Sequence, residues 1–364
     1  MRLPDLPYVL GIVTADELRQ TGAAIAATQE PTGAIPWFPG GHCDPWDHIE
    51  CAMALDLTGF AEEALAAYEF LRTSQRADGS WPSKVTGGEV EDPTFETNQC
   101  AYIAVGVWHH WLLTGDEAFL ARMWPTVSAA LDLVTGHAND RGEIAWSVTE
   151  NGEPREGGPL LTGSSSTYQA LRCGLALADY FDAPQPEWEI AAGRLSHLIC
   201  DHPDVFADKD RFSMDWYYPV LGGALRGAAA HERFLTRWDR YVVPGLGIRC
   251  VDDEPWVTGA ESAECVIALE TVGLTELALK LFADIQHLRA PDGSYWTGWQ
   301  FSANVNWPAE QSTWTAAAVV LAADVLSRTS AASGIFHADD LPVGLALSDG
   351  ACGCAPRDAA RAAR

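Results

Sequence analysis

Basic residues are scarce in this sequence: 23 lysines and arginines stand against 50 aspartates and glutamates, which gives a formal charge of −27 over 364 residues. A chain this acidic repels phosphate backbones and anionic lipid surfaces. Long hydrophobic runs are also missing, since no stretch approaches the ~20 apolar residues that a membrane span needs. We therefore expect neither nucleic acid nor a membrane as a partner.

Signatures of metal and cofactor sites are missing as well. The nine cysteines show no pair followed by a second pair at zinc-site spacing, and no HExxH motif or glycine-rich phosphate loop opens a helix. We expect no metal and no cofactor, and reduced thiols. The apolar stretch over residues 6–13 is short and contains Pro7 and Gly11, unlike a secretory signal. These features predict a cytoplasmic protein.

An internal repeat is the strongest positive feature. Residues 47–81 align without a gap on residues 261–295 at a constant offset of 214, and eleven of the 35 positions are identical. The same offset pairs Glu96 with Glu310, each 49 residues after the first residue of its repeat. Repeats of this length are typical of stacked helical hairpins.

Apolar spacing and capping residues predict twelve helices. They are expected near residues 16–28, 47–57, 60–75, 97–113, 117–137, 165–181, 186–200, 217–228, 230–240, 261–272, 274–287 and 309–328. Nearly all-apolar helices alternate with amphipathic ones, which indicates an inner ring wrapped by an outer ring. We predict an all-α fold, an (α/α)6 toroid with six inner and six outer helices, formed by residues 1–347 as one domain. Residues 348–364 are expected to be a disordered tail, and a small hairpin over residues 143–149 is the most β-structure expected.

Long connections rich in glycine, proline and tryptophan, such as residues 77–95 and 290–308, alternate with tight turns. In a ring of hairpins they share one face. Because barrel function is usually carried by the loops at one end, we expect the site there.

A pair of carboxylates is the expected catalytic centre. Asp47 and Glu261 begin equivalent inner helices, with one inner helix between them around the ring. Hydrolysis of a glycosidic bond needs one carboxylic acid that protonates the leaving oxygen and one carboxylate that activates water. The alternative is that these acids only cap their helices. Other acids remain rivals for the two roles: Asp44, Glu50, Glu96, Glu264 and Glu310.

Aromatic and amide side chains gather on the same predicted face, where aromatic rings can stack on sugars and amides can bind hydroxyls. The expected substrate-binding residues are Trp37, Trp46, Trp81, Asn98, Gln99, Gln169, Trp216, Tyr217, Tyr218, Trp296, Trp299, Asn304, Asn306, Trp307 and Gln311.

Three resemblances extend this interpretation. Gln75 to Trp81 resembles the Q-x3-G-x-W repeat of terpene cyclase and prenyltransferase-like toroids, although the acidic D-x-D-D motif of cyclases is incomplete at residues 250–253. Residues 307–311, with Glu310 and Gln311, look like the segment of glucoamylase-type (α/α)6 glycoside hydrolases that contains the base. That resemblance implies Glu310 as base, whereas the repeat favours Glu261.

The chain as a whole resembles the actinobacterial α-endomannosidases of methylmannose polysaccharide. This resemblance implies hydrolysis of internal α-1,4-mannosidic bonds in a cytosolic polysaccharide. We predict an inverting mechanism with Asp47 as acid and Glu261 as base, their carboxyl groups about 6.5–9.5 Å apart. A terpenoid cyclase or prenyltransferase and a noncatalytic carbohydrate-binding toroid remain the alternatives.

Overall fold

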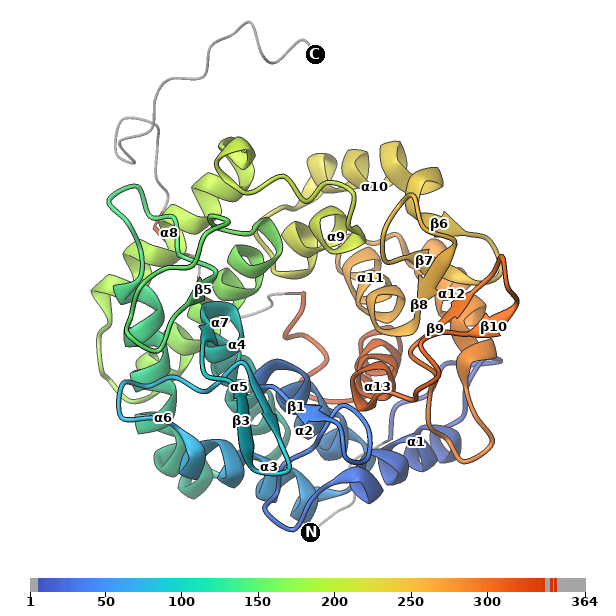
Figure 1. The fold of residues 1–364 in the computed structure, drawn as a ribbon, viewed down its shortest axis with the longest axis horizontal. Helices are drawn as coiled ribbons and strands as arrows, with labels where there is room; N and C mark the ends of the chain where they lie inside the picture. Colours follow the sequence, from blue (N-terminus) through green and yellow to red (C-terminus); the bar gives the residue numbers. More distant parts are fainter. Residues whose placement is uncertain (1–5, 338–340, 343, 346–364) are drawn as a thin grey trace, which may run out of the picture.

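The computed structural model describes residues 6–337, 341–342 and 344–345, and its helices form two concentric rings (Figure 1). The inner ring consists of α2 (Pro45–Thr58), α4 (Thr97–Ala101) continued by α5 (Ile103–Thr114), α7 (Leu161–Tyr180), α9 (Ser213–Leu221), α11 (Gly259–Thr271) and α13 (Thr313–Ser327). The outer ring consists of α1 (Ala15–Thr28), α3 (Ala61–Ser74), α6 (Glu117–Gly136), α8 (Pro186–Asp201), α10 (Gly227–Tyr241) and α12 (Thr275–Asp284). Two short 3₁₀ helices are η1 (Pro203–Val205) and η2 (Ile285–Leu288).

Contacts between neighbouring inner helices close the ring. Each inner helix packs against the next one in the chain, and α13 returns to α2. Each outer helix packs on the inner helix before it, except that α1 covers α13 and supplies the sixth outer position. The (α/α)6 toroid predicted from the repeat is confirmed, and one inner helix, α13, lies between α2 and α11 as expected.

Burial explains the two kinds of helix. The inner helix α13 is buried along almost its whole length, from Thr313 to Val325, because neighbours surround it. The outer helix α3 buries only Ala64, Ala67, Tyr68 and Leu71, the i, i+3, i+4, i+7 stripe of an amphipathic helix. The alternation seen in the sequence therefore reflects one ring enclosed by another.

The Q-x3-G-x-W segment is a structural joint. Gln75 donates from Nε2 to the carbonyl oxygen of Gly79 at 3.0 Å and to that of Thr126 in the next outer helix at 2.9 Å. Gly79 has φ +96°, and a Cβ at this position would lie 2.3 Å from the carbonyl oxygen of Ala129. The turn therefore needs glycine on two counts, its left-handed backbone and its close approach to α6.

Several predicted boundaries differ from the structure. The helix expected over 97–113 is interrupted at Tyr102, between α4 and α5. The helix expected from 217 begins at Ser213 and ends before Gly222 and Gly223, the latter with φ +87°. The helix expected from 309 begins only at Thr313, because Ser312 is its N-cap, so Glu310 lies in the preceding loop.

The structure contains more β-structure than we expected, so that expectation was wrong. A three-stranded sheet has the order β1 (His42–Cys43), β2 (Lys84–Thr86), β3 (Glu89–Asp92). A five-stranded sheet has the order β10 (Val305–Asn306), β9 (Gly298–Gln300), β8 (Trp256–Thr258), β7 (Gly247–Arg249), β6 (Val242–Val243). The hairpin expected over 143–149 is instead a pairing of β5 (Ser147–Val148) with β4 (Phe95–Glu96). These strands have two to four residues, too few for an alternating pattern to appear in the sequence.

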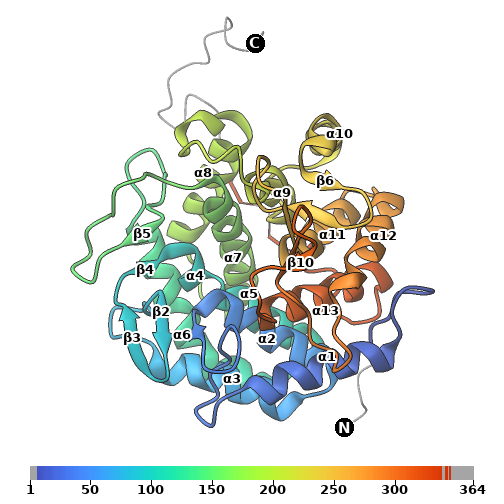
Figure 2. The same cartoon turned by 45° about the vertical axis from the view of Figure 1, so that its right-hand side comes forward.

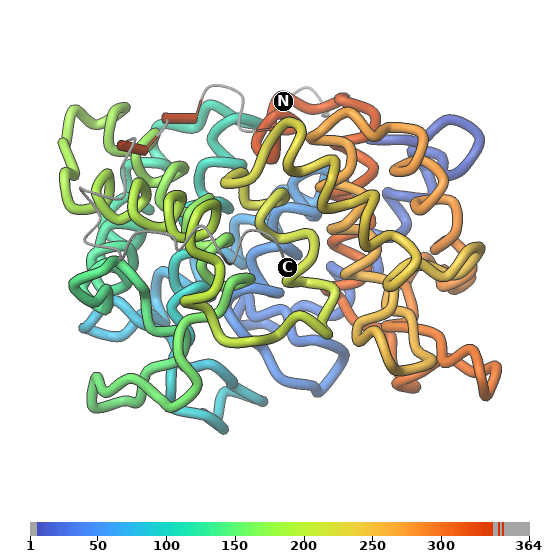
Figure 3. The backbone as a smooth tube through the Cα atoms, turned by 90° about the horizontal axis from the view of Figure 1, so that it is seen from above, coloured from blue at the N-terminus to red at the C-terminus, as the bar shows by residue number. Residues whose placement is uncertain are grey.

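The connections that carry these strands project from one side of the toroid, as predicted for the functional face (Figures 2 and 3). The predicted tail, residues 348–364, lies outside the described residues. In the described part of the chain, no helix combines the length and apolar character needed to cross a membrane. The seven cysteines of that part are all free thiols.

Candidate active site

A cavity of about 360 Å³ opens at the end of the toroid where the inner helices begin. The first turns of five inner helices, α2, α4, α7, α9 and α13, contribute to its wall. The lining residues are Trp37, Asp44, Trp46, Asp47, Glu96, Asn98, Gln99, Trp146, Leu160, Thr162, Gly163, Met214 and Trp314. Four indole rings, three carboxylates and two amides therefore surround one space.

Asp44 and Asp47 have different roles at the start of α2. Asp44 is the N-cap, and its Oδ1 accepts the backbone N–H of Asp47 at 3.0 Å. The capping function is thus filled by Asp44, and the side chain of Asp47 faces the cavity. Burial raises the pKa of Asp47 well above its usual value, and the charges of Asp44, Glu50 and Glu264 raise it further. Asp47 therefore keeps its proton to a higher pH than an exposed aspartate does.

Glu261 occupies the equivalent place at the start of α11, directly after strand β8. Its side chain is buried, and its Oε2 has no hydrogen-bond partner among the described residues. Burial raises the pKa of Glu261, while the nearby Thr258 hydroxyl and Cys250 thiol oppose the rise. Glu261 is not among the residues that line the cavity, and it is 5 % exposed.

A second pair of acids lies one helical turn further along the same two helices. Glu50 accepts the Trp46 indole N–H at 3.2 Å and the Tyr102 hydroxyl at 3.1 Å. Glu264 accepts hydroxyl hydrogen bonds from Tyr217 and from Tyr218, the latter at 2.7 Å. Burial raises the pKa of Glu50 to about 7 and that of Glu264 well above its usual value.

This second pair forms the floor of the site rather than its wall. Neither Glu50 nor Glu264 lines the cavity, and both are buried. Both oxygens of Glu264 and the Oε1 of Glu50 accept hydrogen bonds from aromatic donors, whereas the Oε2 of Glu50 has no partner among the described residues. Their effect reaches the wall through charge, because both raise the pKa of Asp47.

Glu96 and Glu310, also paired by the repeat, each accept an indole N–H. Trp146 Nε1 donates to Glu96 at 3.0 Å, and Trp37 Nε1 donates to Glu310 at 2.8 Å. Burial raises the pKa of Glu96 to about 7 although the Trp146 hydrogen bond opposes the rise. Glu96 lines the cavity itself. Glu310 does not line it, but accepts the hydrogen bond of Trp37, which is a lining residue.

Apart from Trp81 and Trp216, the predicted aromatic residues, together with Asn304 and Asn306, fall into three groups. Trp37 and Trp46 line the cavity. Tyr217 and Tyr218 bind Glu264 in the floor. The remainder lie outside the cavity lining on or near the strands β9 and β10: Trp296, Trp299, Asn304, Asn306 and Trp307.

Trp81 and Trp216 are packing residues, which corrects their prediction as sugar platforms. Trp216 is 0 % exposed, stacks on Tyr241 and donates its indole N–H to the carbonyl oxygen of Arg233 at 2.9 Å. Trp81 is 3 % exposed and donates to the carbonyl oxygen of Leu71 at 2.9 Å. A bulky side chain near a predicted loop can equally pack among the helices and anchor the loop to them.

Two of the predicted amide side chains lie at the cavity wall. Asn98 and Gln99 both line the cavity, and their side-chain oxygens have no hydrogen-bond partner among the described residues. Gln169 is buried on α7, and its Nε2 likewise has no partner among them. Gln311 lies half-buried beside Glu310.

Sequence reasoning missed two of the four cavity indoles, Trp146 and Trp314. Trp314 is the second residue of α13, as Trp46 is of α2, but the offset of 214 pairs it with Cys100, so the repeat gave no signal for it. Trp146 lies just before the two-residue strand β5, and only the pairing of β5 with β4 brings it over Glu96. Tyr102 was missed because a tyrosine inside an apolar helix resembles a core residue.

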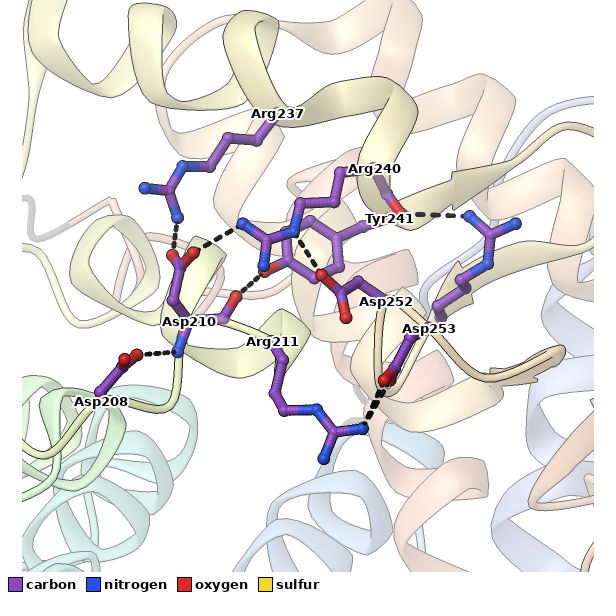
Figure 4. Close-up of polar contacts among 9 residues, drawn as sticks. Asp208, Asp210, Arg211, Arg237, Arg240, Tyr241, Asp252 and Asp253 are labelled. Atoms are coloured by element: carbon purple, nitrogen blue, oxygen red, sulfur yellow. Dashed lines mark hydrogen bonds and ion pairs between the residues drawn. The ribbon is translucent and has the colours of Figure 1, made fainter.

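A network of ion pairs joins the segments that precede α9 and β8 to α10 (Figure 4). Asp210 binds Arg237 and Arg240, and Arg240 also binds Asp252 at 2.6 Å. Arg211 pairs with Asp253 at 2.6 Å. The network ties the segment before α9 to the segment before β8, which carries the Cys250 thiol to Glu261.

In the part of the chain that the structure describes, no three His, Cys, Asp or Glu side chains are grouped so that they could hold a metal ion. The chemistry of the cavity wall is that of carboxylic acids, amides and indole rings.

Comparisons with known proteins show the family and the fold. The chain is 55 % identical over 353 residues to the MMP endo-(1,4)-3-O-methyl-alpha-D-mannosidase of Mycolicibacterium hassiacum, an alignment that covers 97 % of this chain and 98 % of that protein. Its structure resembles a D-mannose isomerase (TM-score 0.69, 13 % identity, 86 % of this chain and 96 % of the other) and a glycosidase (TM-score 0.66, 15 % identity, 85 % and 95 %). These two structures support the fold alone. No protein-family model matches the sequence.

The full-length relationship, the helical toroid and the acid-lined cavity agree with one another. The chain belongs to the family of the MMP endo-(1,4)-3-O-methyl-alpha-D-mannosidase, and it is a glycoside hydrolase.

Proposed function

We propose that this enzyme hydrolyses internal α-(1,4) bonds in a polysaccharide of 3-O-methylmannose, with Asp47 as general acid and Glu261 as general base. The name of the Mycolicibacterium relative describes this activity for that protein, and the two chains align over nearly their whole lengths. The chain's own residues support the proposal as follows.

The position of Asp47 carries the proposal. Its side chain faces the cavity, Asp44 fills the capping role in its place, and its pKa is raised well above the usual range by burial and by three neighbouring carboxyl groups. A general acid must carry its proton at the pH where the enzyme works. The raised pKa of Asp47 favours its protonated form, which supports this role.

The reaction follows from the two acids. Asp47 gives its proton to the glycosidic oxygen as the bond from that oxygen to the anomeric carbon breaks. Glu261 accepts a proton from a water molecule whose oxygen bonds to the anomeric carbon from the opposite face of the sugar. Proton transfers of this kind contribute about 10²–10⁴-fold to the rate. The partner-free Oε2 of Glu261 supports its role as base.

The indole-lined wall supports a methylated sugar as substrate. Trp37, Trp46 and Trp314 present apolar faces on which pyranose C–H groups and O-methyl groups pack, while the amides of Asn98 and Gln99 bind hydroxyls. A terpene cyclase would instead line its cavity with few hydroxyl-binding groups, so the amides and acids disfavour it. We place the reaction in the cytoplasm, where free thiols such as those of the described cysteines persist.

The test is to incubate the wild type, Asp47→Asn and Glu261→Gln with α-(1,4)-mannan oligosaccharides, methylated and unmethylated, and to follow the products by mass spectrometry. We expect shortened chains from the wild type and a loss of at least about 100-fold in each folded variant. Glu96→Gln and Glu310→Gln are the matched controls, because each changes an indole-bound acid outside the proposed pair; we expect losses below about tenfold.

If the folded wild type cleaves none of these glycans, the result would contradict the proposal and favour the noncatalytic carbohydrate-binding toroid. If Glu310→Gln loses more activity than Glu261→Gln, Glu310 is the base and the assignment from the repeat is wrong.

A further inference from the structure

A second hollow lies on the five-stranded sheet, apart from the cavity that Asp47 lines, which we call the axial cavity. It has a volume of about 500 Å³, and its lining includes Glu254, Trp256, Gln300, Val305 and Trp307. None of its lining residues lines the axial cavity. We call it the sheet groove, since strands β8, β9 and β10 each contribute one lining residue and the others lie in the adjoining connections.

The sheet groove presents a fixed aromatic surface to solvent. Trp307 is 52 % exposed and Val305 48 %, two of the most exposed large apolar side chains in the described part of the chain. Trp256 donates its indole N–H to the carbonyl oxygen of Trp307 at 2.7 Å, which holds the Trp256 ring against the Trp307 backbone. An exposed apolar patch flanked by polar groups commonly marks a binding site.

The polar groups of the groove select the kind of ligand. Gln300 is held in place because its Oε1 accepts hydrogen bonds from the Ala303 backbone at 2.6 Å and from Ser302 at 3.0 Å. Glu254 is exposed at the rim, and neither lysine nor arginine lines the groove. Anionic ligands are therefore disfavoured, and indole faces with amide and carboxylate oxygens fit a neutral carbohydrate.

The groove is also connected to the catalytic wall by short stretches of chain. Trp256 precedes Glu261 by five residues, which limits their Cα separation to about 18 Å. Trp307 precedes Glu310 by three residues, and Glu310 holds Trp37 in the cavity wall. A polymer in the axial cavity therefore has a second aromatic surface within reach of its neighbouring sugars.

We propose that the sheet groove, with Trp256 and Trp307, is a second carbohydrate-binding site that holds the polysaccharide outside the cleavage cavity. This inference rests on the proposed function, because it takes the substrate to be a polymer. The site gives long chains an advantage over short ones, since only a long chain occupies the cavity and the groove together.

The experiment measures binding in the cleavage-deficient Asp47→Asn background by isothermal titration calorimetry, with the methylated polysaccharide and with a methylated trisaccharide as separate ligands. We expect Trp307→Ala to weaken polysaccharide binding at least about fivefold and to change trisaccharide binding less than about twofold. Trp307→Phe keeps an aromatic face and should restore most of the affinity. Tyr8→Ala, which removes another aromatic side chain that is 50 % exposed and lies outside the groove, should change neither value.

Separate outcomes distinguish the two proposals. If the wild type cleaves the polysaccharide but Trp307→Ala binds it as tightly as its parent, the groove is not a carbohydrate site and only this inference is overturned. If Trp307→Ala changes the association state in light scattering and leaves sugar binding unaltered, the groove is a contact between copies of the chain, which also overturns it. If the wild type neither cleaves nor binds the glycans, the proposed function fails first.

Discussion

Glu50 and Glu264 stand 214 positions apart in the chain, occupy the same place in the repeated hairpins, and interact in the folded protein, where both are buried and the charge of Glu50 raises the pKa of Glu264. The two carboxyl groups are bound by different aromatic donors, an indole and a phenol for Glu50 and two phenols for Glu264. Two buried carboxylates repel each other more strongly than they would in water, because the protein interior screens their charges poorly. They favour protonated forms both in themselves and in Asp47 above them.

The first prediction concerns stability and pH. Burial raises the pKa of Glu50 from 4.5 to about 7, so the folded protein binds this proton more tightly than the unfolded chain does. The resulting stabilisation is complete below about pH 4.5 and is lost as the pH rises through about 7. Glu50→Gln, which imitates the protonated form, should therefore lose less stability over this interval than the wild type, by at most about 3 kcal/mol.

Denaturant unfolding at several pH values between these limits measures the effect. Glu62→Gln, an exposed glutamate of α3, serves as control and should leave the pH dependence unaltered. A variant at Glu50 that becomes steeper with pH would contradict the sign of the shift.

The second prediction concerns stereochemistry. With Asp47 as acid and Glu261 as base on different helices, we expect water to attack from the face opposite the leaving group and to invert the anomeric configuration. Proton NMR of the first product, recorded before mutarotation, should show the β-anomer from an α-linked substrate. Initial release of the α-anomer would require a covalent intermediate and a shorter separation between the carboxyl groups.

The third prediction concerns the hydrogen bond from Trp37 to Glu310. Trp37→Phe keeps an aromatic ring beside Trp314 but removes the N–H that Glu310 accepts at 2.8 Å. We expect KM to rise about five- to tenfold, with a smaller change in kcat, because the ring positions the sugar and does not transfer a proton. Steady-state kinetics on the methylated oligosaccharide provide the measurement. A fall in kcat at unchanged KM would instead assign Glu310 to the chemical step.

The fourth prediction concerns the joint at Gly79. A Cβ there would lie 2.3 Å from the Ala129 carbonyl oxygen, and the backbone has φ +96°, so Gly79→Ala should destabilise the fold by about 2–4 kcal/mol. Gly88→Ala is the matched control, because it has φ +83° but nothing within 4 Å of the added Cβ. Thermal unfolding should rank the two variants in that order, and equal losses would show that backbone strain alone accounts for the effect.

The repeat made much of the fold predictable. The constant offset of 214 paired Asp47 with Glu261 and Glu96 with Glu310, and the structure places the members of each pair at or beside the ends of equivalent helices. The same offset also paired Glu50 with Glu264, but their burial beneath the wall could not be inferred, because helical spacing alone does not say which turn lies deeper in a ring.

Aromatic residues were the least predictable part of the site. Trp216 and Trp46 are both tryptophans in the first turns of inner helices, yet the Trp216 ring packs outward on Tyr241 of α10, while Trp46 stacks on Tyr102 and lines the cavity. Which way a ring points depends on the space that neighbouring helices leave, and that space is a property of the assembled rings.

By itself, the sequence determined the twelve-helix toroid, the face that carries the long connections and the acids at the helix ends, because hydrophobic period, turn residues and internal repetition are local properties. Only the tertiary structure decided that Asp44 caps α2 while Asp47 faces the cavity, that Trp146 reaches Glu96 through a two-residue strand, and that Trp256 and Trp307 share a separate groove. These relationships join residues distant in the chain, and burial and electrostatic coupling exist only once the ring has closed.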